Sequence, residues 1–348
     1  MSLETLAKVD LHCCFDGAID PSLLATWQAR AGGEATGGSE LAAQLHVSAL
    51  DQLPDRKAWL KAVLRSPDDL TEAALVLARR LIAEVVVHVE LVVDADTLAC
   101  GTLQPIEVVQ AIDAGCEAAV TERDDVFLSW VLLVELPATA DSNACVDLVR
   151  GLVVDRPPRL AGIVVADDPK AGPLSRVAAA VELARRNDLK VVVVAGDRKD
   201  AARVHAALEF GAQRIVGGTA ALSREETLVR LRAGRVPVVS LPTVQMMAGM
   251  ARSWNSHPLK RFKEASVLTA VGSGWPTWTG SSLSGELEAV SRNLHWRLDD
   301  LRNATTRAVE AGFMAPTLRF QLARTVEIWR HRPLVQAQAK AGGDPFAM

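Results

Sequence analysis

Tyrosine is absent from the 348 residues of the chain, which include 8 tryptophans and 7 phenylalanines. This absence excludes a phenol as a general acid or as a hydrogen-bond donor to an oxyanion. Long apolar runs are also missing, because stretches such as residues 191–194 fall far short of the ~20 residues that a helix needs to cross a bilayer. We therefore expect a soluble protein with no membrane partner, whose chemistry uses other side chains.

Basic residues are not in excess. Lysine and arginine number 38 against 42 aspartates and glutamates, and the net charge is −4. A protein that binds nucleic acid by neutralising phosphates carries a basic surplus, so nucleic acid is not an expected partner. The N-terminal residues include Glu4 and Asp10 and show no basic stretch before an apolar run, unlike a secretory signal. A cytoplasmic location is the resulting expectation.

Cysteines are few and scattered. The five are Cys13, Cys14, Cys100, Cys116 and Cys145. An odd number without regular spacing fits neither a disulfide framework nor a paired Cys-x-x-Cys zinc site. Reduced thiols are therefore expected.

Short β-branched runs alternate with longer segments of helical periodicity along the chain. This alternation predicts a parallel sheet of the α/β class. Near-continuous apolar runs such as residues 191–194 fit strands that are covered on both faces. A doubly wound dinucleotide-binding sheet would carry a GxGxxG motif after an early strand, and the sequence has none there.

The number of candidate strands favours a closed barrel over an open sheet. Eight are found, which is the number that closes a (β/α)8, or TIM, barrel. We predict a single barrel domain over residues 1–348, with a frayed tail at residues 340–348. The strands are expected at residues 8–12, 85–93, 127–135, 162–166, 190–195, 214–216, 237–241 and 267–272.

The first predicted strand ends in side chains that can do chemistry. His12 and Cys14 are two residues apart, so on a strand they share a face. They lie at the C-terminal end of the barrel, where such folds keep their active sites. Residues 11–17 read Leu-His-Cys-Cys-Phe-Asp-Gly. This stretch resembles the first-strand motif Leu-His-x-His-Leu-Asp-Gly of the adenosine deaminase family.

Five further segments resemble motifs of that family in the same order. Residues 194–197 (VAGD) are similar to its His-Ala-Gly-Glu, and residues 214–218 (RIVGG) to its Arg-Leu-Gly-His-Gly. About six ordered matches are far more specific than any single motif. The five segments are residues 85–93, 162–169, 194–197, 214–218, and 257–259 with 272–276.

The resemblance implies a zinc site whose ligands this sequence has mostly lost. In the family the ion is held by two first-strand histidines, the histidine of His-Ala-Gly-Glu and an aspartate after the last strand. The residues at these positions are His12, Cys14, Val194 and Gly274. Valine and glycine carry no donor atom, and a catalytic zinc needs about three protein ligands. We therefore expect no metal and no other cofactor.

A rebuilt metal site stays open as an alternative. The two first-strand donors are chemically competent zinc ligands, and a third could come from Asp197, Asp94 or Asp167. Gly217 stands where the family has the histidine that orients the zinc-bound water, so this alternative lacks the family's base.

The surviving titratable groups favour acid/base or thiol chemistry without a metal. We expect His12, Cys14 and Asp197 to be catalytic, since Asp197 stands at the position of the family glutamate that protonates the purine ring. A neighbouring imidazole can lower the pKa of a thiol and make it a nucleophile. The alternative is that His12 and Cys14 are packing residues.

The resemblance places five further residues around the ligand. Asp16 matches the aspartate that binds the ribose 5′-hydroxyl in the family, and Gly17 follows it. Asp167 replaces a glycine that approaches the purine, so adenosine itself is expected to fit poorly, and Asp168 matches the next acid. Trp275 replaces an aspartate and could stack on a planar ligand or fill the space left by the metal. These five are the predicted substrate-binding residues.

The resulting hypothesis is an adenosine-deaminase-like protein without a functional zinc site. It binds a small planar or nucleoside-like molecule at the barrel mouth and is repurposed for metal-free chemistry. Two alternatives stay open: a non-catalytic relative that binds a ligand or a partner protein, and a divergent purine or nucleoside deaminase with a rebuilt metal site. A homo-oligomer is compatible with all three.

Overall fold

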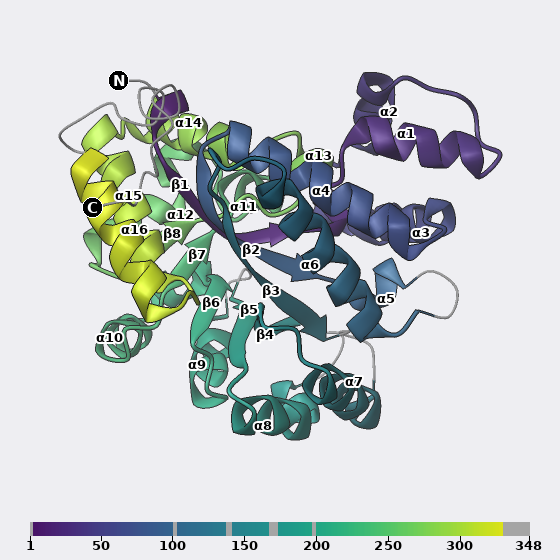
Figure 1. The fold of residues 1–348 in the computed structure, drawn as a ribbon. Coiled ribbons are helices and arrows are strands. Elements are labelled where there is room, and N and C mark those ends of the chain that lie inside the picture. Colours follow the sequence, from purple (N-terminus) through teal and green to yellow (C-terminus); the bar gives the residue numbers. More distant parts are fainter. Residues whose placement is uncertain (1–2, 100–102, 137–140, 167–172, 197–199, 330–348) are drawn as a thin grey trace.

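Eight parallel strands form one sheet in the order β1 to β8 in the computed structural model (Figure 1). The structure describes residues 3–99, 103–136, 141–166, 173–196 and 200–329. Each strand pairs with the next one along the chain, in parallel. The (β/α)8 barrel is confirmed. The strands are β1 (Lys8–Cys14), β2 (Val86–Val93), β3 (Ser129–Leu136), β4 (Leu160–Ala166), β5 (Lys190–Ala195), β6 (Arg214–Gly217), β7 (Val238–Ser240) and β8 (Thr269–Val271).

The sheet closes on itself just beyond the end of β8. Cys13 forms a parallel bridge with Gly274. The Cys14 amide donates to the Gly274 carbonyl at 2.7 Å, and the Gly274 amide donates to the His12 carbonyl at 2.9 Å. Gly274 has a φ of +69°, a conformation that glycine adopts without steric cost. The C-terminal end of β1 is therefore fixed by the segment after β8.

Helices surround the sheet and close one end of it. In Figure 1, α15 and α16 lie where β1 begins, while α3 and α5 lie on the side toward which β1, β2 and β3 point. The helices are α1 (Pro21–Arg30), α2 (Gly38–Leu45), α3 (Leu53–Val63), α4 (Pro67–Ala83), α5 (Ala95–Leu98), α6 (Pro105–Thr121), α7 (Ser142–Val154), α8 (Ala178–Arg186), α9 (Ala201–Glu209), α10 (Glu225–Ala233), α11 (Pro242–Met247), α12 (Pro258–Glu264), α13 (Pro276–Thr279), α14 (Leu283–Leu294), α15 (Leu298–Ala311) and α16 (Pro316–Trp329).

Helix α4 shows how the sequence builds the outer layer. Ser66 caps its N-terminus by accepting from the Asp69 amide, and Pro67 occupies its first turn, where proline needs no hydrogen bond. Leu70, Leu77 and neighbouring alanines at three- and four-residue spacing are buried, as the periodicity predicts. This face packs against the barrel and α6.

The buried apolar residues form two clusters. The inner cluster fills the barrel with residues such as Val9, Leu133 and Val239, and includes Val309 and Leu322 from α15 and α16. The outer cluster lies between the strands and the surrounding helices. Because α15 and α16 contribute to the inner cluster, they close the N-terminal end of the barrel. The C-terminal end remains the place for a site.

Two further expectations concern the membrane and the thiols. Within the ranges given above, no helix is long and apolar enough to cross a bilayer. The four described cysteines, Cys13, Cys14, Cys116 and Cys145, are free. The tail at residues 340–348 lies outside the described residues.

Candidate functional site

Strand β1 contains a bulge that decides which of its side chains face the barrel interior. Leu11 and His12 together lie opposite Glu90 of β2, because the pairings on either side leave two residues against one. A bulge of this kind changes the face that the following residues take. Cys14 therefore packs with Leu11 in the inner cluster, whereas Cys13 packs in the outer cluster.

His12 is buried and lies beside charged groups in the barrel. Its Cβ would be 3.2 Å from a Cβ added at Gly272, the residue after β8. Burial lowers the pKa of His12 to about 4, with the charge of Arg214 adding to the effect and that of Glu90 opposing it. Nδ1 has no hydrogen-bond partner among the described residues. His12 is thus a neutral imidazole near pH 7.

Cys14 lies on the same inner face as His12 but in an environment that disfavours the thiolate. Its exposed fraction is 3%. Burial raises the pKa of Cys14 well above its ordinary value, and the charges of Asp16 and Glu135 raise it further. A thiol with a raised pKa is a poor nucleophile near pH 7. The thiol could act as a metal ligand only if the metal itself displaced the proton.

Four charged residues meet at the C-terminal mouth of the barrel, and we call them the mouth cluster: Asp16, Lys57, Asp94 and Glu135. Asp16 begins the short 3₁₀ helix η2 (Asp16–Ala18) after β1, and Asp94 caps α5 directly after β2. Glu135 is the penultimate residue of β3. Lys57 reaches in from α3, and its Nζ lies 2.7 Å from Asp94 Oδ2, 3.6 Å from Asp16 Oδ2 and 3.8 Å from Glu135 Oε2.

The electrostatics of the mouth cluster separate the roles of its carboxyl groups. Burial alone would lower the pKa of Lys57, but the charges of Glu135, Asp16 and Asp94 raise it above its ordinary value. Burial would raise the pKa of Asp94, and the contact with Lys57 instead lowers it. Burial raises the pKa of Asp16 against the opposing charge of Lys57. Lys57 and Asp94 thus form an ion pair.

Glu135 is a member of the mouth cluster whose protonation can change near neutral pH. Burial raises its pKa to about 7, with the charges of Asp94 and Asp16 contributing and that of Lys57 opposing. Its side chain is nevertheless 23% exposed, so the carboxyl group can be reached from the mouth. An acid with a pKa near the working pH is suited to general acid/base catalysis.

Lys57 and Glu135 are not among the site residues predicted from the sequence, and Asp94 is predicted there only as a possible metal ligand. Glu135 had a readable signal, because it is the single charged residue of β3 (SWVLLVEL) and stands at the C-terminal end of the strand. No such signal exists for Lys57. Lys57 lies 37 residues before Asp94 in the sequence, and only the tertiary structure brings the two side chains together.

The predicted ligand-binding residues Gly17 and Trp275 lie against each other. A Cβ added to Gly17 would lie 2.5 Å from both Cβ and Cδ1 of Trp275. Trp275 caps α13 and is partly buried against both apolar clusters. Asp16 accepts from the Gly17 amide at 2.9 Å. The structure therefore brings Asp16, Gly17 and Trp275 together at the ends of β1 and β8.

Gly17→Ala is expected to lower the free energy of unfolding by about 1–3 kcal/mol, the usual cost of overpacking. The added methyl group would overlap the Trp275 side chain. Urea denaturation measures the change. Gly151→Ala in α7 is the matched control, because nothing lies within 4 Å of its added Cβ. Equal stability of Gly17→Ala and the wild type would contradict the close contact.

The remaining predicted site residues are not placed by the structure. Asp167, Asp168 and Asp197 lie outside the described residues. Their predicted roles in ligand binding and catalysis stay predictions.

The described residues do not fit the zinc site that the family resemblance implies. His12 and Cys14 offer two donors on one strand, and the neutral imidazole with its unpartnered Nδ1 suits a ligand. Val194 has no donor atom and packs against the inner cluster. In the described part of the chain, no group of three or more histidine, cysteine, aspartate or glutamate side chains could hold a metal ion. A catalytic zinc needs about three protein ligands.

Comparison with known proteins places the whole barrel in one family. The family model described as adenosine deaminase matches residues 7–329. An adenine deaminase of Rhodospirillum rubrum is 24% identical over 326 residues, which cover 92% of this chain and 96% of that protein. An aminodeoxyfutalosine deaminase of Streptomyces avermitilis is 24% identical over 93% of this chain and 91% of its own length. The crystal structure of adenine deaminase from Arthrobacter aurescens superposes with a TM-score of 0.83 at 19% identity, covering 94% of this chain and 100% of that one.

These matches correct the function expected from the sequence. The hypothesis of a repurposed protein with metal-free acid/base or thiol chemistry is wrong, because relatives that match over more than 90% of this chain are named deaminases. The loss of zinc-ligand side chains at individual positions is weaker evidence about function than the similarity to these deaminases along the whole barrel. The alternative of a divergent purine or nucleoside deaminase agrees better with the comparisons. The chain belongs to the adenosine deaminase family.

Proposed function

We propose that the protein hydrolytically removes an exocyclic amine from a purine base or purine nucleoside bound at the barrel mouth. Family membership and the names of the full-length relatives support this reaction class. The observation that carries the proposal is Glu135, a reachable carboxyl group at a strand end with a pKa of about 7.

The reaction needs a group that both accepts and donates a proton. Water adds to the ring carbon that bears the amine, a C–O bond forms, the C–N bond breaks and ammonia leaves. The proton lost by water must reach a ring nitrogen or the departing amine. Near pH 7 Glu135 is divided between its protonated and ionised forms, so it can take up this proton and return it. Lys57 offers the ionised form a positive charge 3.8 Å away.

The binding surface in this proposal consists of Asp16, Gly17 and Trp275. Gly17 leaves room for the close approach of Trp275, and the indole presents an apolar surface beside Asp16 for a planar ligand. Asp167, Asp168 and Asp197 complete the site on the grounds of the family motifs alone. A cytoplasmic location belongs to the same proposal, and the free thiols of the four described cysteines support it.

A substrate panel tests the proposal. The purified full-length chain is incubated with adenine, adenosine or adenosine monophosphate, once with added zinc and once with a chelator, and products are identified by mass spectrometry. We expect conversion of a base or a nucleoside to the corresponding oxo-purine. The poor fit of adenosine predicted from Asp167 would appear as a preference for another member of the panel. Measurable binding without conversion under every metal condition would overturn the proposal and leave a non-catalytic binding protein.

A further inference from the structure

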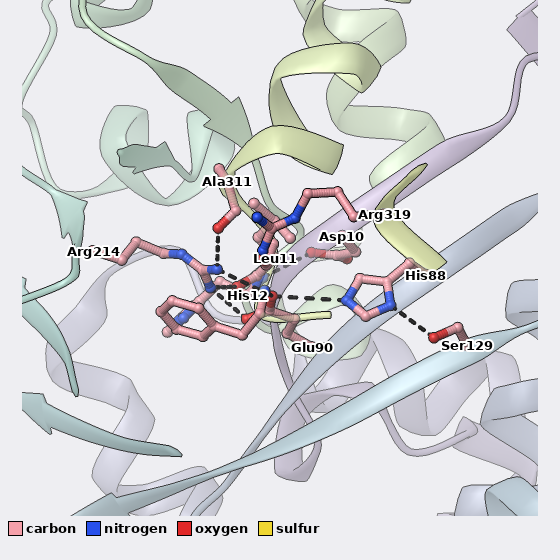
Figure 2. A network of polar contacts seen from close by, with 11 residues as sticks. Asp10, Leu11, His12, His88, Glu90, Ser129, Arg214, Ala311 and Arg319 are labelled. Atoms are coloured by element: carbon pink, nitrogen blue, oxygen red, sulfur yellow. Dashed lines mark hydrogen bonds and ion pairs between the residues drawn. The ribbon is translucent and has the colours of Figure 1, made fainter. Parts of the chain in front are cut away.

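A buried ion pair between β6 and β2 lies in the barrel interior (Figure 2). Arg214 of β6 and Glu90 of β2 both have exposed fractions of 0%. The guanidinium group donates to both carboxylate oxygens, and its Nη2 lies 3.0 Å from Oε1. His88 lies on the other side of Glu90 and contacts Ser129 of β3 at 3.1 Å. Figure 2 places Leu11 and His12 of β1 beside the pair.

The pair also holds the junction between α15 and α16. Nη2 of Arg214 donates to the Ala311 carbonyl at 2.7 Å, and the Phe313 amide donates to Glu90 Oε1 at 2.6 Å. The Phe313 ring lies 3.9 Å from the guanidinium carbon. Both charged groups thus form a hydrogen bond with backbone of the segment that closes the N-terminal end of the barrel.

Arg214 makes one further contact, and that contact is to the bulge in β1. Its Nη1 donates to the Leu11 carbonyl at 3.3 Å. A bulge takes backbone groups out of the regular ladder, and a buried carbonyl group then needs another partner. Leu11 is followed directly by His12, so this hydrogen bond holds the backbone that carries the imidazole.

Stability alone does not account for a charged pair at this place. Two buried charges lose their hydration, and apolar side chains of similar volume often give equal or greater stability. What apolar side chains cannot supply is the hydrogen bond to the Leu11 carbonyl. We propose that Arg214, held in place by Glu90, is a positioning residue that fixes the β1 bulge and thereby turns His12 and Cys14 into the barrel. The inference rests on the proposed function only for the expected effect on kcat.

The test compares the wild type with the double variant Glu90→Leu/Arg214→Met, which removes both charges together. Hydrogen exchange of the β1 amides at residues 12–14 is measured by mass spectrometry and NMR, beside urea denaturation and kcat. We expect a loss of stability, because the Leu11 and Ala311 carbonyl groups and the Phe313 amide lose their partners. Exchange at these β1 amides should be at least ~10-fold faster and kcat at least ~10-fold lower. Ser129→Ala is the matched control, because it removes the His88 contact in the same layer and leaves Arg214 untouched.

A second variant covers the case in which the double variant is unstable. Arg214→Lys keeps a positive charge opposite Glu90 but lacks the planar fork that reaches two carbonyl groups at once. It is expected to loosen the same β1 amides. Unchanged β1 exchange in a folded double variant and in Arg214→Lys would overturn the inference. If the wild type shows no turnover, the proposed function fails, while the exchange result still decides this inference.

Discussion

Arg214→Met is expected to lower the free energy of unfolding by about 3–5 kcal/mol, the usual cost of leaving one member of a buried ion pair without its partner. Glu90 would remain in the barrel interior without the guanidinium group that donates to both of its oxygens. Urea denaturation at pH 7 measures the loss. Arg292→Met removes an exposed ion pair with Glu288, and this control should change stability by less than about 1 kcal/mol. A similarly small change in Arg214→Met would contradict the interpretation.

The dependence of stability on acidic pH gives a second test of the Arg214–Glu90 ion pair. Burial alone would raise the pKa of Glu90, but the charge of Arg214 lowers it from 4.5 to about 2. A carboxyl group with a lowered native pKa stabilises the fold above its unfolded pKa, and this contribution is lost as the pH falls through the native value. Stability of the wild type should therefore decline between about pH 4.5 and pH 2. Arg214→Met should lose this dependence.

Glu135→Gln is expected to lower kcat by at least ~10²-fold, at the low end of the effect of a general acid/base group. The amide keeps the size of the side chain and cannot exchange a proton. The ionisation with a pKa of about 7 should also disappear from the pH profile of kcat/KM, which reports the ionisations of the free enzyme. Steady-state rates across pH 5–9 measure both effects, and KM should change less than kcat because the side chain keeps its shape.

Glu288→Gln is the control for this prediction. Glu288 lies on the exposed face of α14 and pairs with Arg292, away from the mouth cluster. Its kcat and pH profile should match the wild type. If Glu135→Gln kept the change in rate near pH 7, that ionisation would belong to a different group.

The barrel could be predicted because its signals are local. The apolar strands, the helical stripes between them and the number of strands are all readable within short windows. The strand ends are the least accurate part of the prediction. The apolar runs begin before the pairing does at β3 (Ser129–Leu136) and β8 (Thr269–Val271). At β7 and β8 the flanking residues Pro237, Leu268 and Gly272 still form backbone hydrogen bonds with the neighbouring strands.

The site could be predicted only in part, because its geometry depends on contacts across the fold. His12 and Cys14 do lie on the inner face, but this follows from a bulge, since Leu11 also points inward. The sequence does not reveal that the bulge depends on Arg214, 203 residues away. Lys57 is likewise placed by tertiary structure. The hypothesis of metal-free acid/base or thiol chemistry is wrong for a different reason. The absence of zinc-ligand side chains at the family positions does not indicate which other reaction a protein catalyses.

Hydrolysis in water enriched in ¹⁸O tests the central claim most directly. Hydrolytic deamination forms the new C–O bond with an oxygen atom from water, so the oxo-purine product should carry ¹⁸O while an equal amount of ammonia is released. Mass spectrometry of the product reads the label. Absence of any labelled product, with the purine recovered unchanged from a folded protein that binds it, would contradict the assignment.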